Sequence, residues 1–393
     1  MKNWESVKLG DLYEVHNGLS KGGKFFGSGY PFLTFSTVFN NYFLPEELTD
    51  FVQSTEKERE SYSIMRGDVF VTRTSETSDE LGISCVALKD YPNATYNGFT
   101  KRMIPITDRV LPEYIGYYMR MPSFRGEFQA FSTMTTRASL KNEDLLSLEV
   151  KLPEIDEQKK IAEILSAYDD LIENNQKQIK LLEEAAQRLY KEWFVDLHFP
   201  GHENTKIVDG VPEGWEYRKI GDIVIYYDKQ RKPLSSMQRM SMEKIYPYYG
   251  AATLMDYVDN YLFDGIYLLL GEDGTVITPD KFPVLQYVWG KFWVNNHAHV
   301  LRGKEGISTE FLFSMFKEMP IADVVTGAAQ PKISQGRLSE KKILIPSLKL
   351  IQKWSSIAKH FFDRLRVLSE QVRLLTEARD RLLQKLMSGE IAV

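Results

Sequence analysis

The 393-residue chain lacks the features that mark exported or membrane-bound proteins. It has one cysteine, Cys85, which excludes an internal disulfide framework. No apolar run reaches the length of a membrane span, and the opening MKNWESVKLG has no signal-peptide core. These absences predict a cytoplasmic protein without a membrane partner. Cys85 lies in the strand-like run GISCVAL, which favours a buried, inert thiol over a nucleophile.

Positive charge is also scarce. The chain has 49 Lys and Arg against 54 Asp and Glu, a net charge of −5. Only residues 347–393 have a positive balance, with nine basic and five acidic side chains. Binding to nucleic acid would therefore need locally clustered cations, or positive charge supplied by partner proteins.

What the chain does contain is an internal repeat. A period near 200 residues indicates a duplicated domain with its connector, because solenoid repeats are about 20–50 residues long. The matching segments are VKLGDL from Val7 with RKIGDI from Arg218, GDVFVTR from Gly67 with GIYLLLG from Gly265, TYNG from Thr95 with VNNH from Val294, PEYIGYYM from Pro112 with TEFLFSMF from Thr309, and the segments ending at Pro153 and Pro346.

Each copy is followed by a heptad pattern, which predicts two long helices. From Ile161 to Trp193 the first helix would be about 50 Å long. The shared register favours an antiparallel pair within one chain, with an intermolecular coiled coil as the alternative. The two seams are Ile161, Leu165, Tyr168, Ile172, Asn175, Ile179, Leu182, Ala186, Leu189 and Trp193, and Trp354, Ala358, Phe361, Leu365, Leu368, Val372, Leu375, Arg379, Leu382 and Leu386.

The modules themselves combine short strand-like runs with a few helical stretches, which predicts a mixed α+β domain in each copy. Six loops join Lys or Arg to glycines, aromatics and small polar residues, and such residues suit contacts with phosphates and base edges. Solvated surface loops are the alternative. The predicted DNA contacts are Lys21, Lys24, Arg73, Thr74, Lys101, Arg102 and Arg137 in the first copy, and Lys229, Arg231, Lys232, His297, His299, Gln330 and Lys332 in the second.

Catalytic motifs are weak by comparison. GLSKGGK, from Gly18, has the spacing of a phosphate-binding loop, but Phe25 stands where the Mg²⁺-binding hydroxyl belongs. His297 and His299 could suggest a metal, yet the alignment puts Gly98 and Thr100 in their places in the first copy. We therefore expect no catalytic residue, no metal and no cofactor, with a metal enzyme based on the two histidines as a minor alternative.

The whole chain resembles the specificity subunits of type I restriction-modification systems. The resemblance rests on the KLGDL and KIGDI openings, on YLLLGEDGTV from Tyr267, NNHAHVLRG from Asn295 and AAQPKIS from Ala328, and on the long helix after each IP or LP. The first copy departs from the pattern, with TTRASLK in place of AAQPKIS.

The resemblance implies an α+β fold with two mixed α/β target-recognition domains, 1–150 and 200–346, separated by a long antiparallel two-helix coiled coil with a pseudo-two-fold internal repeat. The spacer helices would be 151–199 and 347–393, with Ile172, Asn175, Ile179, Leu182, Leu365, Leu368, Val372 and Leu375 along their seam.

The implied function is non-catalytic. The chain would recognise a bipartite, asymmetric site in double-stranded DNA and dock two DNA adenine methyltransferase subunits and the restriction/translocase subunits. A protein-protein scaffold, with two β-rich modules on a coiled coil, is the competing hypothesis.

Overall fold

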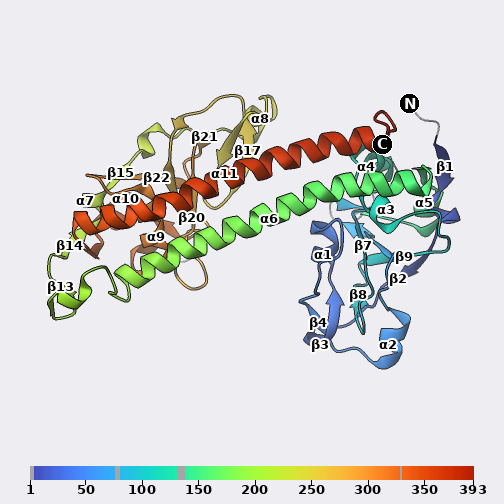
Figure 1. Ribbon diagram of the computed structural model, residues 1–393, viewed down its shortest axis with the longest axis horizontal. Coiled ribbons are helices and arrows are strands. Elements are labelled where there is room, and N and C mark those ends of the chain that lie inside the picture. Colours follow the sequence, from blue (N-terminus) through green and yellow to red (C-terminus); the bar gives the residue numbers. More distant parts are fainter. Residues whose placement is uncertain (1–3, 76–79, 131–137, 328–329) are drawn as a thin grey trace. The chain divides into compact units, whose positions relative to one another are not determined.

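The computed structural model describes residues 4–75, 80–130, 138–327 and 330–393 (Figure 1). The chain divides into two compact units. The first unit contains the residues up to Glu173 together with Arg373–Val393, and the second contains Asn174–Val372. Within the described ranges, no helix combines the length and the apolar character needed to cross a membrane.

The first unit contains a four-stranded antiparallel sheet in the order β2-β9-β5-β7 and a three-stranded sheet in the order β4-β3-β8. The strands β1 and β11 form an antiparallel ribbon, and so do the short β6 and β10. The bounds are β1 Glu5–Lys8, β2 Tyr13–Asn17, β3 Phe26–Leu33, α1 Phe35–Asn40, β4 Phe51–Val52, α2 Glu56–Ser61, β5 Val69–Thr72, β6 Thr74–Ser75, β7 Ser84–Val86, β8 Thr95–Tyr96, β9 Thr100–Pro105, α3 Pro112–Tyr118, α4 Pro122–Ala130, β10 Ala138–Ser139, α5 Asn142–Ser147 and β11 Glu149–Leu152.

The second unit repeats this topology. Its four-stranded sheets have the orders β15-β22-β19-β20 and β17-β16-β21-β18, and β14 pairs with β25 as β1 does with β11. The bounds are β12 Ile207–Val208, β13 Val211–Pro212, β14 Glu216–Lys219, α7 Ile220–Ile223, β15 Val224–Tyr226, α8 Ser236–Met240, β16 Tyr246–Tyr249, β17 Leu254–Val258, β18 Phe263–Asp264, β19 Tyr267–Gly271, β20 Leu285–Val288, β21 Lys291–Val294, β22 Ala298–Gly303, α9 Thr309–Lys317, β23 Val325–Thr326, β24 Lys332–Ile333, α10 Gln335–Glu340 and β25 Lys342–Ile345.

Short polar residues set the beginnings of several helices. The side chain of Ser308 accepts a hydrogen bond from Phe311 N at the start of α9, and Ser334 caps α10 through Arg337 N. Pro112 occupies the first turn of α3, where its fixed φ suits a helix and no backbone donor is needed. These signals are local, so α3 and α9 begin at Pro112 and Thr309, where the sequence pattern predicts helices.

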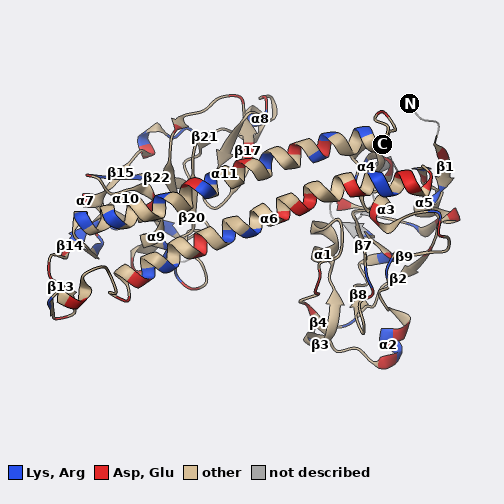
Figure 2. Cartoon of the chain, viewed as in Figure 1, with Lys and Arg blue, Asp and Glu red and all other residues tan. Residues whose placement is uncertain are grey.

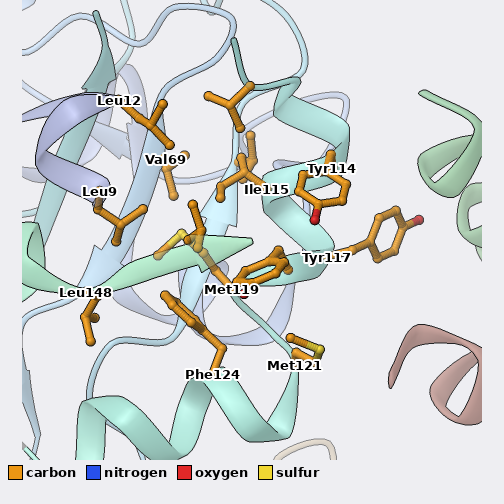
Figure 3. Packing of buried hydrophobic residues seen from close by; sticks show 14 of the residues in the cluster. Leu9, Leu12, Val69, Tyr114, Ile115, Tyr117, Met119, Met121, Phe124 and Leu148 are labelled. Carbon is orange, nitrogen blue, oxygen red and sulfur yellow. The ribbon is translucent and has the colours of Figure 1, made fainter. Parts of the chain in front are cut away.

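The core of the first unit lies between the β2-β9-β5-β7 sheet and the helices. Figure 3 shows Leu9, Leu12 and Val69 gathered near Ile115 of α3. Tyr117 extends from α3, and its hydroxyl donates to Asp169 Oδ2 at 2.6 Å. The predicted inert thiol of Cys85 is confirmed as fully buried, and burial raises its pKa to about 12.

Two long helices contribute to both cores: α6 (Ile155–Phe194) and α11 (Leu348–Met387). In the first unit, the beginning of α6 packs with the end of α11, where Arg379 contacts Asp169 Oδ1 at 2.6 Å. In the second, the end of α6 packs with the beginning of α11. The helices therefore pair antiparallel within one chain, and the predicted internal pair is confirmed over the intermolecular alternative.

The predicted seam is buried or half-buried along its length. Leu165, Trp354 and Leu368 are fully buried, and the polar Asn175 lies 3.5 Å from Gln371 Oε1 across the pair. At three places a neighbour is more deeply buried than the predicted residue, namely Tyr190 beside Leu189, Phe362 beside Phe361 and Leu383 beside Leu382. Phe362 packs against rings of β20 and α9, so contacts with the module override the heptad there.

The structure corrects the predicted alignment of the two copies by one residue in their central strands. Val71 and Met103 face the helix-side core of the first unit, as Leu270 and Leu301 do in the second. Val71 and Leu270 are 199 residues apart, and Met103 and Leu301 are 198 residues apart. The sequence match had used offsets of 198 for the first strand and 199 for the second. A one-residue slip exchanges the two faces of a strand, so the partners of every side chain change.

Candidate nucleic-acid interface

In the first unit, loops from four parts of the chain join in a row at one end of the central sheet. Gly98 N donates to Leu19 O on one side of the β8–β9 turn, and Arg73 N donates to Phe99 O on the other. Leu140 N then donates to Arg73 O. Gly18 allows the first contact, because a Cβ there would lie 2.1 Å from the carbonyl oxygen of Asn97.

The second unit has the same row. Glu272 N donates to His297 O in the β21–β22 turn, and Ile333 N donates to Glu272 O. On the far side of the turn, Arg231 Nη1 reaches Asn296 O at 3.4 Å. The bridge between Asp273 and Lys332 is antiparallel, as is the pairing of β6 with β10. The loops singled out from the sequence therefore converge in each unit.

A buried charged network holds the second row together. His299 is 1% exposed, its Nδ1 lies 2.6 Å from Asp228 Oδ2, and its Nε2 lies 2.8 Å from the carbonyl oxygen of Ile333. Both partners are acceptors, so the ring links the two segments by donating a hydrogen bond. Arg231 adds a cation to this network, with its Nη1 2.6 Å from Glu272 Oε2.

Ligand atoms of Asp228, Glu272 and His299 lie within 4.8 Å of one another, a spacing that could suit a metal ion. Arg231 and Lys332 nevertheless contact the same carboxylates. Charges of the chain itself thus balance this cluster. His299 links the loop after β15 to the segment before α10, and at 1% exposure it has little surface for the predicted DNA contact.

Replacing His299 by Leu should lower the free energy of unfolding by about 1–3 kcal/mol, because two buried acceptors lose their donor. Urea unfolding followed by tryptophan fluorescence would measure it, since five of the six tryptophans lie in the second unit. His297→Ala is the matched control, because that side chain is 48% exposed and should change stability by less than about 0.5 kcal/mol. Equal losses would contradict the network.

The first unit places Lys101 where the second has His299. Lys101 is 6% exposed and its Nζ donates to Asn142 Oδ1. Burial, and secondarily the charge of Arg73, lowers the pKa of Lys101. Neighbouring Arg102 is also buried, with its Nε 2.7 Å from Asp68 Oδ2. These two cations have little exposed surface. Their role is to hold the loops in place through Asn142 and Asp68.

The remaining predicted contacts differ in exposure. Lys21 is half-buried against Glu58 Oε2 at 2.7 Å, and Arg73 and Arg231 are also half-buried. Arg137 lies outside the described residues, as does the side chain of Thr74. The exposed predicted residues are Lys24, Lys229, Lys232, His297, Gln330 and Lys332.

Three parts of these rows were not among the predicted DNA contacts. The turn at Gly250, closed by Gly250 N to Thr253 O, lies beside Gly271, whose Cβ would be 3.4 Å from Ala251 O. The β19–β20 loop, beginning at Glu272, carries the acidic partners of the network. Phe99 is 61% exposed in the middle of the first row. In the sequence, an aromatic residue next to a strand pattern cannot be distinguished from a core residue. Only the fold shows that Phe99 is exposed.

Charge is mixed over the whole chain. Lys and Arg alternate with Asp and Glu along α6 and α11 (Figure 2). The exposed lysines of the loop rows are thus local features on an acidic background.

Comparison with known proteins identifies the class. The family model described as the type I restriction modification DNA specificity domain matches residues 1–184 and 212–373. The MjaIX specificity subunit of Methanocaldococcus jannaschii is 25% identical over all of this chain and 94% of its own length. A putative type I specificity subunit of Haemophilus influenzae is 32% identical over 36% of each chain. The crystal structure of an S subunit from M. genitalium has a TM-score of 0.59 at 17% identity, covering 98% of this chain and 96% of that one.

The chain belongs to the family of type I restriction-modification DNA specificity proteins. The predictions of a non-catalytic specificity subunit and of a duplicated α+β fold with paired long helices are thereby confirmed.

Proposed function

We propose that each loop row binds one half of a bipartite, asymmetric site in double-stranded DNA. Residues 1–150 and 200–346 then form the two target-recognition domains, and 151–199 and 347–393 the spacer helices. The supporting observation is that both units bring equivalent loops together through two matching backbone hydrogen bonds, with unlike side chains. Like frameworks with unlike side chains suit two different half-sites.

Modest positive charge limits how much DNA affinity the chain can provide. The exposed Lys24, Lys229, Lys232 and Lys332 are the best candidates for phosphate contacts. Several other cations are already paired with carboxylates, such as Arg231 with Glu272. Most phosphate neutralisation would then come from partner subunits.

The helices supply surfaces for those partners. Leu171 and Leu181 on α6, and Val367 and Leu374 on α11, are 50–63% exposed. Apolar side chains at such positions favour protein contacts over free solvent. We assign these faces to two DNA adenine methyltransferase subunits, with restriction/translocase subunits joining the assembled complex.

Double replacement of Lys229 and Lys232 by Ala should weaken binding to all DNA sequences alike. Loss of up to two phosphate contacts should reduce the slope of log affinity against log salt by about 1–2. Filter or fluorescence titration of the complex with its methyltransferase at several salt concentrations would measure this. Lys206→Ala, at an exposed lysine outside the loop row, is the matched control. An unchanged salt slope in the double variant would remove these lysines from the interface.

The function itself is tested by methylation. Co-expression with the methyltransferase subunit of the same system should place methylated adenines in a single bipartite sequence, which sequencing that detects modified bases would reveal. Exchange of residues 200–346 for those of a relative should change one half of that sequence and leave the other intact. The scaffold hypothesis predicts no such methylation and no salt-dependent DNA retention.

A further inference from the structure

Phe99 is an apolar side chain in an otherwise polar turn. Its ring is 61% exposed, although most aromatic side chains of the first unit lie in a core. The backbone fixes the residue, because Phe99 N donates to Asn97 Oδ1 at 2.6 Å and Phe99 O accepts from Arg73 N at 3.1 Å. The backbone is fixed, yet the ring stays in water and does not gain the free energy of burial. This exposure suggests that the ring binds a partner outside the chain.

The corrected register makes Phe99 equivalent to His297. His297 N donates to Asn295 Oδ1 at 2.8 Å, and His297 O accepts from Glu272 N at 2.8 Å. Asn97 N and Asn295 N likewise donate to the ends of β3 and β16. The sequence match had placed His297 opposite Gly98, one residue away.

The residue two positions further on is a buried basic side chain in both units. Lys101 donates to Asn142 at the start of α5, and His299 contacts Ile333 O just before α10. Phe99 and His297 are turn residues directly before β9 and β22, so each exposed residue stands two positions before an anchored one. The buried contact fixes the strand that begins directly after the exposed residue. Less conformational entropy is therefore lost when the exposed residue binds DNA.

We propose that Phe99 and His297 are matched specificity-determining positions. Phe99 contacts the 5-methyl group of a thymine in the first half-site, and His297 hydrogen-bonds to a base edge in the second. An apolar side chain in the major groove recognises thymine by this methyl group, whereas an imidazole recognises a donor or acceptor. Equivalent backbone positions thereby read unlike bases. The inference rests on the proposed DNA-recognition function.

Deoxyuridine scanning tests the contact at Phe99, because uracil pairs like thymine but lacks the methyl group. With the full chain bound to its methyltransferase, one substitution in the first half-site should weaken wild-type binding about fourfold. Phe99→Ala should bind wild-type DNA at least fourfold more weakly and lose all sensitivity to that uracil. His297→Ala should relax the methylated sequence only in the second half-site.

Phe51→Ala is the matched control, because Phe51 is also an exposed phenylalanine of the first unit, 41% exposed on β4. It should keep the uracil sensitivity. The proposal is overturned if Phe99→Ala retains that sensitivity, if no thymine is sensitive in the wild type, or if the variant weakens every sequence equally. Failure of the wild-type complex to select any sequence would instead refute the proposed function.

Discussion

Trp354→Ala is expected to lower the free energy of unfolding by about 3–5 kcal/mol, the usual loss for a large aromatic side chain in a core. Trp354 is fully buried at the beginning of α11. Its ring packs edge-on against Tyr190 of α6 and Phe311 of α9, with centroid distances of 5.8 Å. One side chain thus joins both long helices to the second module, and alanine would leave a cavity among all three.

Urea unfolding followed by circular dichroism would measure the loss without depending on the removed indole. Trp354→Phe should cost less, because the ring remains and the buried Nε1, which has no partner among the described residues, disappears. Val367→Ala, 50% exposed on the same helix, should change stability by less than about 0.5 kcal/mol. A small effect of Trp354→Ala would mean that the helices do not depend on this cluster.

Asp68→Ala is expected to destabilise the first unit by a similar amount, about 3–5 kcal/mol, because it leaves a buried guanidinium without its counter-charge. Asp68 and Arg102 are 1% and 5% exposed, and Asp68 Oδ2 also accepts from Met65 N at 2.7 Å. Thermal unfolding of the full chain would show the loss. The double variant Asp68→Ala with Arg102→Met should recover part of it, since no buried charge then remains.

Arg102→Met alone should make stability depend on pH. Burial raises the pKa of Asp68, opposed by hydrogen bonding from Met65 N and by the charge of Arg102. Without Arg102 the pKa rises further, so the folded state binds the proton more tightly than the unfolded state. The variant should therefore lose stability as pH rises from the ordinary carboxyl range through the raised pKa. Unfolding midpoints at about pH 5 and pH 8 test the sign, and a variant that gains stability with pH would contradict it.

The larger features of the fold could be predicted because they have long-range periodicity. The heptad steps from Ile161 and from Trp354 extend over many turns, so a local error such as Phe361 for Phe362 does not change the helix. The duplication was detectable for the same reason. Agreement over many residues outweighs a mismatch at one position.

The strands carried less information. Val69–Thr72 is buried on both faces, so no alternation of polar and apolar residues fixed the register between the copies. A shift of one residue was enough to hide the equivalence of Phe99 with His297.

The burial of Lys101, Arg102 and His299 could not be predicted for a related reason. A sequence of Lys or Arg in a strand does not show whether the side chain meets solvent or a carboxylate from a distant segment. Arg102 meets Asp68, and His299 meets Asp228, in contacts that only the tertiary fold creates. Loops such as that containing Lys229 and Lys232 were identifiable because turn residues keep charged side chains at the surface.

The division of the chain has a consequence for its synthesis. The second unit is one continuous stretch, Asn174–Val372, whereas the first needs Arg373–Val393, including the buried Leu383 and Leu386. A ribosome makes the chain from the N-terminus, so the module translated first is the last to obtain all of its core. A truncated mRNA that lacks the codons for Arg373–Val393 would yield a chain in which the second unit is complete and the first unit lacks part of its core.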